Sequence, residues 1–332
     1  MNNTQISVVI VAYKRDNFLA QSINSVLNQT LEKSFYEIVV ITDFEFAQKN
    51  EFEKLGVRFF LDKQKEYCKK ISSIVEHLNG NIVCFLDDDD LFHEKKLSHV
   101  LEIFSTNYDL FFTQNNMRII NEAGNTEKDK FYNLKYTLND NILEINSYED
   151  IRNIFKMNIG FNNSSISVRK EVLTKNLDIL IQMDGRMDAF LLLSSLSTNK
   201  KICFINDVLT DYRVHDSNNS IALFNVKKRT EMYRRHHSDW VILAEFSKNS
   251  ENEWIKEIID EQLVYFSIMI KLFSSNIKKN EILNSLSVFM KKYNLSIMLK
   301  NSIIFVALIS LFSKTSARWL IGSLSMLMWK IL

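Results

Sequence analysis

Four consecutive carboxylates, Asp87–Asp90, follow one apolar run of the sequence and precede another. Carboxylates this close repel one another, and no lysine or arginine lies between them. Asp87 and Asp89 are two residues apart, so a turn after a strand can aim both at one point, where their oxygens would suit Mg²⁺ or Mn²⁺. The alternative is that the aspartates cap a helix beginning near His93. One or two aspartates fit that alternative and four do not, which favours a metal site.

The elements that would position these carboxylates alternate between strand and helix. β-Branched runs predict strands at 6–11, 37–42, 57–61, 82–86 and 110–113, and apolar residues at helical spacing predict helices near 19–27, 65–78 and 93–104. This alternation is typical of an α/β fold with a mostly parallel sheet flanked by helices. Ligands of such sheets bind beyond the carboxyl ends of the strands. Asp43 and the four aspartates all follow strands, so we expect them at the same edge.

Composition narrows the class of protein. The 332 residues are 46% hydrophobic and 24% charged, as in an ordinary globular protein. Three widely separated cysteines without a CxxC spacing argue against a disulfide framework or a zinc site, and the polar opening stretch is unlike a signal peptide; we therefore expect a cytoplasmic protein. Neither GxGxxG nor GxxxxGK[ST] occurs, which argues against dinucleotide oxidoreductases and P-loop enzymes. A nucleotidyltransferase would want a glycine-rich, basic loop after the first strand, and no glycine follows that strand.

The charge of the chain is unevenly distributed. The net charge is +1, yet residues 262–332 carry nine Lys or Arg and one acid, which leaves the body acidic. We expect a body at 1–221, with halves 1–114 and 115–221 and a polar, loop-like stretch near 115–146, and a helical, basic, apolar tail at 222–332.

The tail contains the uncharged run 302–312, which is too short to span a membrane. Basic and tryptophan residues beside it suit a helix that lies in the membrane interface and is attracted by anionic lipid. The tail therefore predicts a peripheral protein on the inner face of the cell membrane. A helical subdomain packed on the body and a subunit interface that would make an oligomer remain alternatives, whereas no nucleic-acid partner is expected.

Two short segments, Ser25–Thr30 (SVLNQT) and Leu86–Asp90 (LDDDD), have a characteristic composition. They resemble the family-2 glycosyltransferases of the GT-A fold: the first is similar to the end of the family's first helix, and the second is similar to its Leu-Asp-x-Asp-Asp element. Asn163–Leu173 is similar to its acceptor-side segment, Gly185–Phe190 falls where the family has a Glu-Asp pair, and Tyr212–Ser220 is similar to its Tyr-Arg-x-His-x-x-Asn-x-Ser ending. The resemblance covers about residues 5–220, with Met187 in place of the Glu of the pair.

This resemblance implies a metal-dependent, inverting transfer of a sugar from a nucleotide-diphosphate donor, expected to be a UDP-sugar. The implied acceptor is a saccharide or a lipid-linked molecule of cell-surface polysaccharide or glycolipid synthesis. The resemblance implies that the nucleotide is bound by Ala12, Tyr13, Arg15 and Asp43, with Lys70 in place of a family arginine. It implies substrate contacts by Asp87, Asp88 and Arg213. Asp89 and His215 would be ligands of Mn²⁺ or Mg²⁺, and Asp188 would be the catalytic base.

Several of these residues also have a simple structural explanation when each is considered alone. Asp188 could begin a helix, Asp43 could lie in an ordinary loop, His215 could lie in a surface turn and Arg15 could be a solvated helix start. The pair His236-His237 is expected to be solvated, since no carboxylate or cysteine lies at ligand spacing. The missing Glu at Met187 leaves a non-catalytic protein that binds sugar nucleotides, or a scaffold, as the alternative function.

Overall fold

The computed structural model of the chain describes residues 4–13, 15–126, 141–143, 162–197, 201–215, 226–248, 250 and 253–273. Residues 274–332, with most of the basic tail, and Asp216–Ser220 of the last family-like segment lie outside the described residues. The chain divides into two compact units, Met1–His215 with Ser250–Ile255, and Asp216–Asn249 with Lys256–Leu332.

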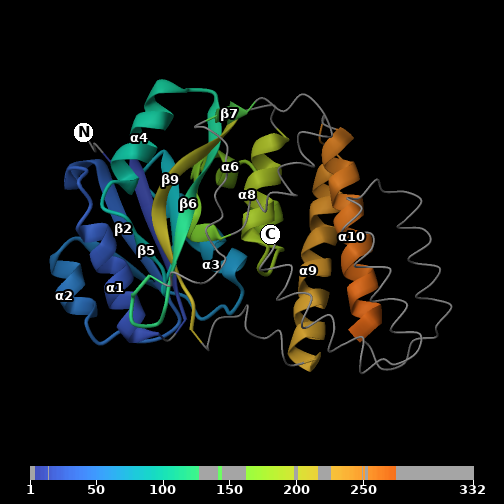
Figure 1. Ribbon diagram of the computed structural model, residues 1–332, viewed down its shortest axis with the longest axis horizontal. Helices are drawn as coiled ribbons and strands as arrows, with labels where there is room; N and C mark the ends of the chain where they lie inside the picture. Colours follow the sequence, from blue (N-terminus) through green and yellow to red (C-terminus); the bar gives the residue numbers. More distant parts are fainter. Residues whose placement is uncertain are drawn as a thin grey trace. The chain divides into compact units, whose positions relative to one another are not determined.

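The first unit contains a 9-stranded sheet with the order β3-β2-β1-β4-β8-β6-β9-β5, and β7 pairs with β9 beside this path (Figure 1). The strands β1 (Ile6–Ala12), β2 (Tyr36–Thr42), β3 (Val57–Leu61) and β4 (Ile82–Asp87) are parallel to one another. β6 (Leu110–Ile120) and β9 (Lys201–Arg213) are also parallel, whereas β5 (Leu91–Phe92), β7 (Asn141–Leu143) and β8 (Ile166–Arg169) pair in antiparallel fashion. The predicted α/β class is confirmed.

The register brings three strand ends to one level. Val11 of β1 is paired with Asp87 of β4, and Ala12 is paired with Thr42 of β2. The carboxyl ends of β1, β2 and β4 therefore lie side by side, at the edge where a ligand site was expected.

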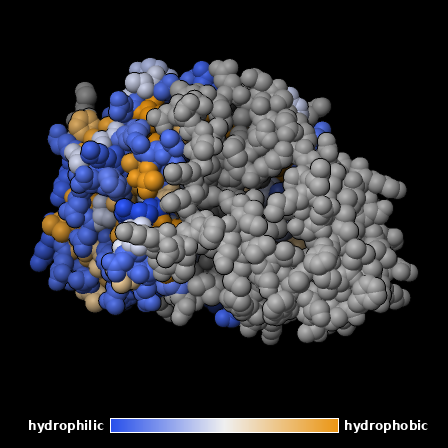
Figure 2. All heavy atoms as spheres, viewed as in Figure 1, coloured by the Kyte–Doolittle hydropathy of each residue, from blue (hydrophilic) through white to orange (hydrophobic). Residues whose placement is uncertain are grey.

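Helices cover both faces of this sheet. The helices α1 (Asp16–Leu27), α2 (Lys49–Lys54) and α4 (Lys96–Thr106) share one hydrophobic core with β1, β2 and β4. The helices α3 (Tyr67–Ile74), α6 (Lys170–Thr174) and α8 (Met187–Leu196) lie against the other face (Figure 1). Short turns η1 (Lys33–Phe35), η2 (Val75–His77), η3 (Asn163–Ser165) and α7 (Leu177–Leu180) connect these elements. On the face drawn in Figure 2 the described residues are mainly hydrophilic, as expected for the outside of such a core.

One predicted boundary is wrong. The sequence predicted a strand that ends at 113 and a polar loop from 115, but β6 continues to Ile120 with Asn115 and Asn116 buried. The amide of Asn115 donates to Thr210 Oγ1 at 3.0 Å, and that of Asn116 donates to the Asn206 carbonyl at 2.7 Å. These hydrogen bonds to β9 compensate for the loss of water, so polar side chains can lie inside the sheet.

The second unit contains α9 (Val226–Ser247) and most of α10 (Glu253–Phe273), and the two helices lie side by side (Figure 1). Trp240 is fully buried, and the ring centroids of Tyr233 and Phe266 are 6.0 Å apart. His236 and His237, which were expected to be solvated, are half-buried: His236 lies edge-on to Phe266, and His237 Nε2 is 3.0 Å from Ser267 Oγ. None of the helices in the described part of the chain is both long and apolar enough to cross a membrane.

Candidate active site

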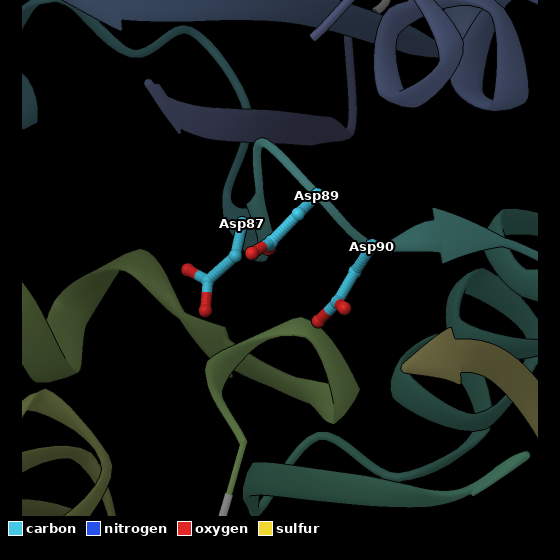
Figure 3. Close-up of side chains that lie close together, drawn as sticks. All are labelled: Asp87, Asp89 and Asp90. Carbon is cyan, nitrogen blue, oxygen red and sulfur yellow. The ribbon is translucent and has the colours of Figure 1, made fainter. Parts of the chain in front are cut away.

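The four aspartates form a tight turn that we call the acid turn, Asp87–Asp90. β4 ends at Asp87, the Asp90 N–H donates to the Asp87 carbonyl at 3.2 Å, and β5 follows directly. Asp88 and Asp90 are fully buried, Asp89 is almost fully buried and Asp87 is half-buried. One carboxylate oxygen from each of Asp87, Asp89 and Asp90 lies within 4.8 Å of the others, and the three carboxyl groups extend to the same side of the turn (Figure 3).

The chain supplies a cation to this turn from a distant segment, although no lysine or arginine lies between the four aspartates in the sequence. Arg15, just before α1, forms ion pairs with both Asp88 and Asp89. Asp88 is further fixed because its Oδ2 accepts the Tyr13 N–H at 2.7 Å. Arg15 was expected in the nucleotide pocket, and the structure places it on the acid turn.

The two predicted metal ligands come together. His215 Nε2 lies 3.0 Å from Asp89 Oδ2, although 126 residues separate them, and both side chains are buried. Adjacent ligands of an octahedral Mg²⁺ at about 2.1 Å would be about 3 Å apart. The spacing therefore suits a hydrogen bond as well as two neighbouring ligands of one cation.

Residues that the sequence did not single out hold the acid turn from behind. The Ser164 hydroxyl accepts the Asp87 N–H at 3.0 Å, and the Ser164 carbonyl accepts hydrogen bonds from Lys96 Nζ and from Thr210 Oγ1. Lys96 is fully buried. A sequence signal for it exists, because Lys96 precedes the buried Val100 and Phe104 at four-residue spacing, which places all three on one helix face.

Arg213 also lies behind the turn. It is fully buried, its N–H donates to Asp90 Oδ1 at 2.9 Å, and its guanidinium donates to the carbonyls of Asp89 and Glu122 at 2.7 and 2.8 Å. Its guanidinium carbon also lies 4.8 Å from the centre of the Phe18 ring. These contacts give Arg213 a positioning role, and the predicted contact with the diphosphate stays a prediction.

The electrostatics of the turn favour a positive ligand. Burial raises the pKa of Asp87 to about 7, and Asp89 and Asp88 add to the rise. Burial likewise raises the pKa of Asp88 to about 6, although Arg15 opposes this. The pKa of Asp90 lies well above its ordinary value, mainly through burial and then through Asp89. Each carboxylate thus holds its charge at a cost that a bound cation would relieve.

The residues that were expected to bind a nucleotide lie beside the acid turn, near the ends of β1 and β2. Lys70 is fully buried, its Nζ donates to the Ala12 carbonyl at 3.3 Å, and it lies 4.1 Å from the centre of the Tyr13 ring. Asp43 is close enough to Lys70 to counteract the lowering of its pKa by burial. Asp43 Oδ1 is buried and accepts no hydrogen bond from any described residue. Ala12, Tyr13, Lys70 and Asp43 are therefore brought together, with an acceptor oxygen left over for a ligand.

The predicted base lies in the first turn of α8. Asp188 is 9% exposed, its Oδ1 accepts the Ala189 N–H at 2.9 Å, and its Oδ2 is 3.3 Å from Arg186. The segment just before it is tied to α3, because the Asp184 carbonyl accepts the Cys68 N–H at 3.2 Å. The neighbouring Tyr67, which sequence reasoning missed, lies close enough to Asp87 to lower the pKa of that carboxyl. The role of Asp188 as a base stays a prediction.

The residues present fit a divalent cation. Asp87 Oδ1 and Asp90 Oδ2 are buried and accept no hydrogen bond from the described residues, so each has a lone pair to offer. Carboxylate oxygens with one imidazole nitrogen are a donor set that Mg²⁺ and Mn²⁺ accept.

Comparison with known proteins agrees with this geometry. Residues 7–176 match the profile of the family described as glycosyl transferase family 2. A curated protein of Rickettsia bellii, named an uncharacterized glycosyltransferase, is 31% identical over 129 residues, which are 37% of this chain and 18% of that protein. A protein of the same description from Rickettsia conorii is 31% identical over 129 residues, 37% of this chain and 21% of its own length. The chain thus spans about a fifth of the curated relatives that it matches.

Solved structures share the fold. The S. aureus TarS 1–349 complex with UDP-GlcNAc is similar with a TM-score of 0.61 and 14% identity, covering 95% of this chain and 90% of that one. The mannosyltransferase PcManGT from Pyrobaculum calidifontis, with GDP-Man and Mn²⁺, has a TM-score of 0.53 and 11% identity, covering 98% of this chain and 87% of that one. At these identities the likeness concerns the fold, and it confirms the predicted GT-A architecture.

Proposed function

Because this chain belongs to glycosyl transferase family 2, we propose that it is a metal-dependent, inverting glycosyltransferase that uses a nucleotide-diphosphate sugar. The observation that carries the proposal is the meeting of Asp87, Asp89, Asp90 and His215 at the carboxyl edge of the parallel strands. That TarS and the Pyrobaculum mannosyltransferase were solved with UDP-GlcNAc and with GDP-Man and Mn²⁺ supports a donor of this class. The acceptor that we propose is a saccharide or lipid-linked molecule of cell-surface polysaccharide or glycolipid synthesis.

Each residue of the site has a task in this proposal. Asp89 and His215 hold Mn²⁺ or Mg²⁺, and Asp87 and Asp90 offer further oxygens to it or to its waters. The cation, when bound, supplies positive charge that stabilises the departing diphosphate. Ala12, Tyr13 and Lys70 enclose the nucleoside, and the unpaired oxygen of Asp43 accepts a hydrogen bond from a base N–H, as uracil would offer.

Asp188 takes the proton of the attacking acceptor hydroxyl. A single displacement of this kind, with attack opposite the leaving group, inverts the anomeric carbon. We also propose that the basic tail brings the enzyme to the cytoplasmic surface of the membrane, where a lipid-linked acceptor would lie. Sedimentation of the full chain with anionic but not with neutral vesicles tests this; no sedimentation with either would contradict it.

The donor site is tested by calorimetric titration of UDP and GDP into the full chain, with Mn²⁺ and then with EDTA. We expect UDP to bind only with Mn²⁺. Binding of GDP but not of UDP would replace the uridine assignment. Equal affinity for UDP in Mn²⁺ and in EDTA would remove the metal from the proposal.

The variant Asp188→Asn separates an enzyme from a protein that only binds sugar nucleotides. Loss of a general base lowers turnover by about 10²- to 10⁴-fold, while UDP affinity should be unchanged. Asp178→Asn is the matched control, since Asp178 is exposed in the first turn of α7. Transfer that is undetectable in the wild-type chain with all UDP- and GDP-sugars would favour the non-catalytic alternative, for which the buried Met187 in place of a carboxylate argues.

A further inference from the structure

The guanidinium of Arg15 lies where it competes with a cation. Arg15 Nη1 forms an ion pair with Asp89 Oδ2, the oxygen that also lies 3.0 Å from His215 Nε2. Arg15 Nη1 itself is 3.4 Å from His215 Nε2. One oxygen atom thus faces the arginine, the histidine and the position of the proposed metal. Because a guanidinium and a divalent cation repel each other, Arg15 and the metal cannot both occupy this side of Asp89.

Arg15 is held differently from Arg213, the other arginine at the turn. Arg213 is fully buried and donates to backbone carbonyls, which have no charge to lose. The Arg15 side chain is 22% exposed, and its Nε makes no hydrogen bond to any described residue. Arg15 therefore has an unused donor and access to solvent, which a residue that changes partners needs.

The two aspartates that bind Arg15 are not equivalent. Asp88 is fully buried and its second oxygen accepts the Tyr13 N–H at 2.7 Å, so Asp88 is fixed to the main chain. Asp89 faces His215 and the proposed cation. Arg15 can accordingly keep its Nη2 contact with Asp88 while its Nη1 leaves Asp89.

We propose that Arg15 is an exchangeable counter-ion that occupies Asp89 in the empty site and moves to the donor's diphosphate when the metal binds. This rests on the proposed function. Arginine suits the exchange because its fork of N–H donors matches the geometry of both carboxylate and phosphate. A metal ion alone has to displace Arg15 from Asp89 without giving it another anion in exchange, whereas metal with a diphosphate offers Arg15 a new anion. Metal and nucleotide therefore bind cooperatively, and each raises the affinity for the other by the same factor.

The test measures the affinity of the full chain for Mn²⁺ at pH 8, without UDP and with saturating UDP. Mn²⁺ is titrated into the protein, and the electron paramagnetic resonance signal of free Mn²⁺ reports how much remains unbound. Arg15→Gln removes the charge, and Arg15→Lys keeps the charge without the fork. Arg118→Gln is the matched control, because Arg118 pairs with Asp211 outside the acid turn. Removing a neighbouring opposite charge changes the proton affinity of a carboxylate by roughly 10-fold or more. We expect Arg15→Gln to bind Mn²⁺ alone at least about 10-fold more tightly than the wild type, with a smaller further gain from UDP.

The affinity of Arg15→Lys for Mn²⁺ alone should lie between those of the wild type and Arg15→Gln. The affinity of Arg118→Gln should match that of the wild type. Equal or weaker binding of Mn²⁺ alone by Arg15→Gln overturns the inference while leaving the proposed function in place, provided the wild type binds Mn²⁺ with UDP. Failure of the wild type to bind Mn²⁺ with UDP overturns both. If circular dichroism shows that Arg15→Gln is unfolded, Arg15→Lys decides, and an unchanged affinity for Mn²⁺ alone counts against Arg15.

Discussion

Lys96 offers a quantitative test of the network behind the acid turn. Its ammonium group is fully buried, donates to the Ser164 carbonyl and lies 3.1 Å from Thr210 Oγ1 and 4.0 Å from the centre of the Phe92 ring. Burial lowers the pKa of Lys96 from 10.5 to about 7, although Cys84 and Asp90 oppose the shift. The substitution Lys96→Met keeps most of the volume and removes the titrating group.

The sign and size of the effect follow from these pKa values. Between pH 7 and 10.5 an unfolded chain keeps the Lys96 proton while the folded chain has mostly lost it, so raising the pH stabilises the folded state. From pH 7 to pH 9 the gain is roughly 2 kcal/mol. Lys96→Met lacks this gain, so the difference in unfolding free energy between wild type and variant should change by that amount, in favour of the wild type.

Urea unfolding of both proteins at pH 7, 8 and 9 measures the difference. Lys95→Met is the matched control, because Lys95 is the exposed neighbour of Lys96. A difference between wild type and Lys96→Met that is constant over this range would refute the reasoning. It would mean that Lys96 keeps its charge in the folded protein.

Two further predictions concern residues that fix the shape of the site. Arg213→Ala leaves the buried Asp89 carbonyl without its donor, so we expect a loss of about 1–3 kcal/mol, against less than about 1 kcal/mol for the partly exposed ion pair removed by Arg118→Ala; equal losses in urea unfolding would contradict this. Asn162 has φ of +70° and accepts the Ser164 N–H at 2.9 Å. Gly tolerates this φ, so Asn162→Ala should be less stable than Asn162→Gly by about 1 kcal/mol in urea unfolding, and the reverse order would disprove the strain.

Much of the first half of the fold could be predicted because its signals are local. The run Ile6–Val11 is buried on both faces and β-branched, and β1 covers Ile6–Ala12. The same holds for β2 and β4, whose continuous apolar runs leave no other pattern to compete. β6 was cut short because Gln114–Asn116 looks like a turn, and only the partners on β9 and η3 make it a buried strand.

The sequence indicated candidate residues for the site, but it did not reveal which of them are in contact. Asp89 and His215 could be chosen as candidates because both lie in family-like segments, and the structure places them 3.0 Å apart, while their role as metal ligands stays a prediction. The Arg15 contact was missed because nothing in the stretch Ala12–Asp16 reveals which carboxylate lies opposite in space. The role of Ser164 could not be predicted either, because it depends on the Asp87 N–H and the Thr210 hydroxyl that the fold places beside it.

The length of chain between the acid turn and its partners also matters during synthesis. Arg213 and His215 follow Asp90 and Asp89 by 123 and 126 residues. At about 5–20 residues per second, a ribosome needs about 6–25 s to supply them. Until then β5 lacks β9, its partner in the sheet, and Asp89 lacks the imidazole. A nascent chain therefore carries its acidic segment for many seconds in an unfinished state, and Asp89 and His215 can come together only after residue 215 has been made.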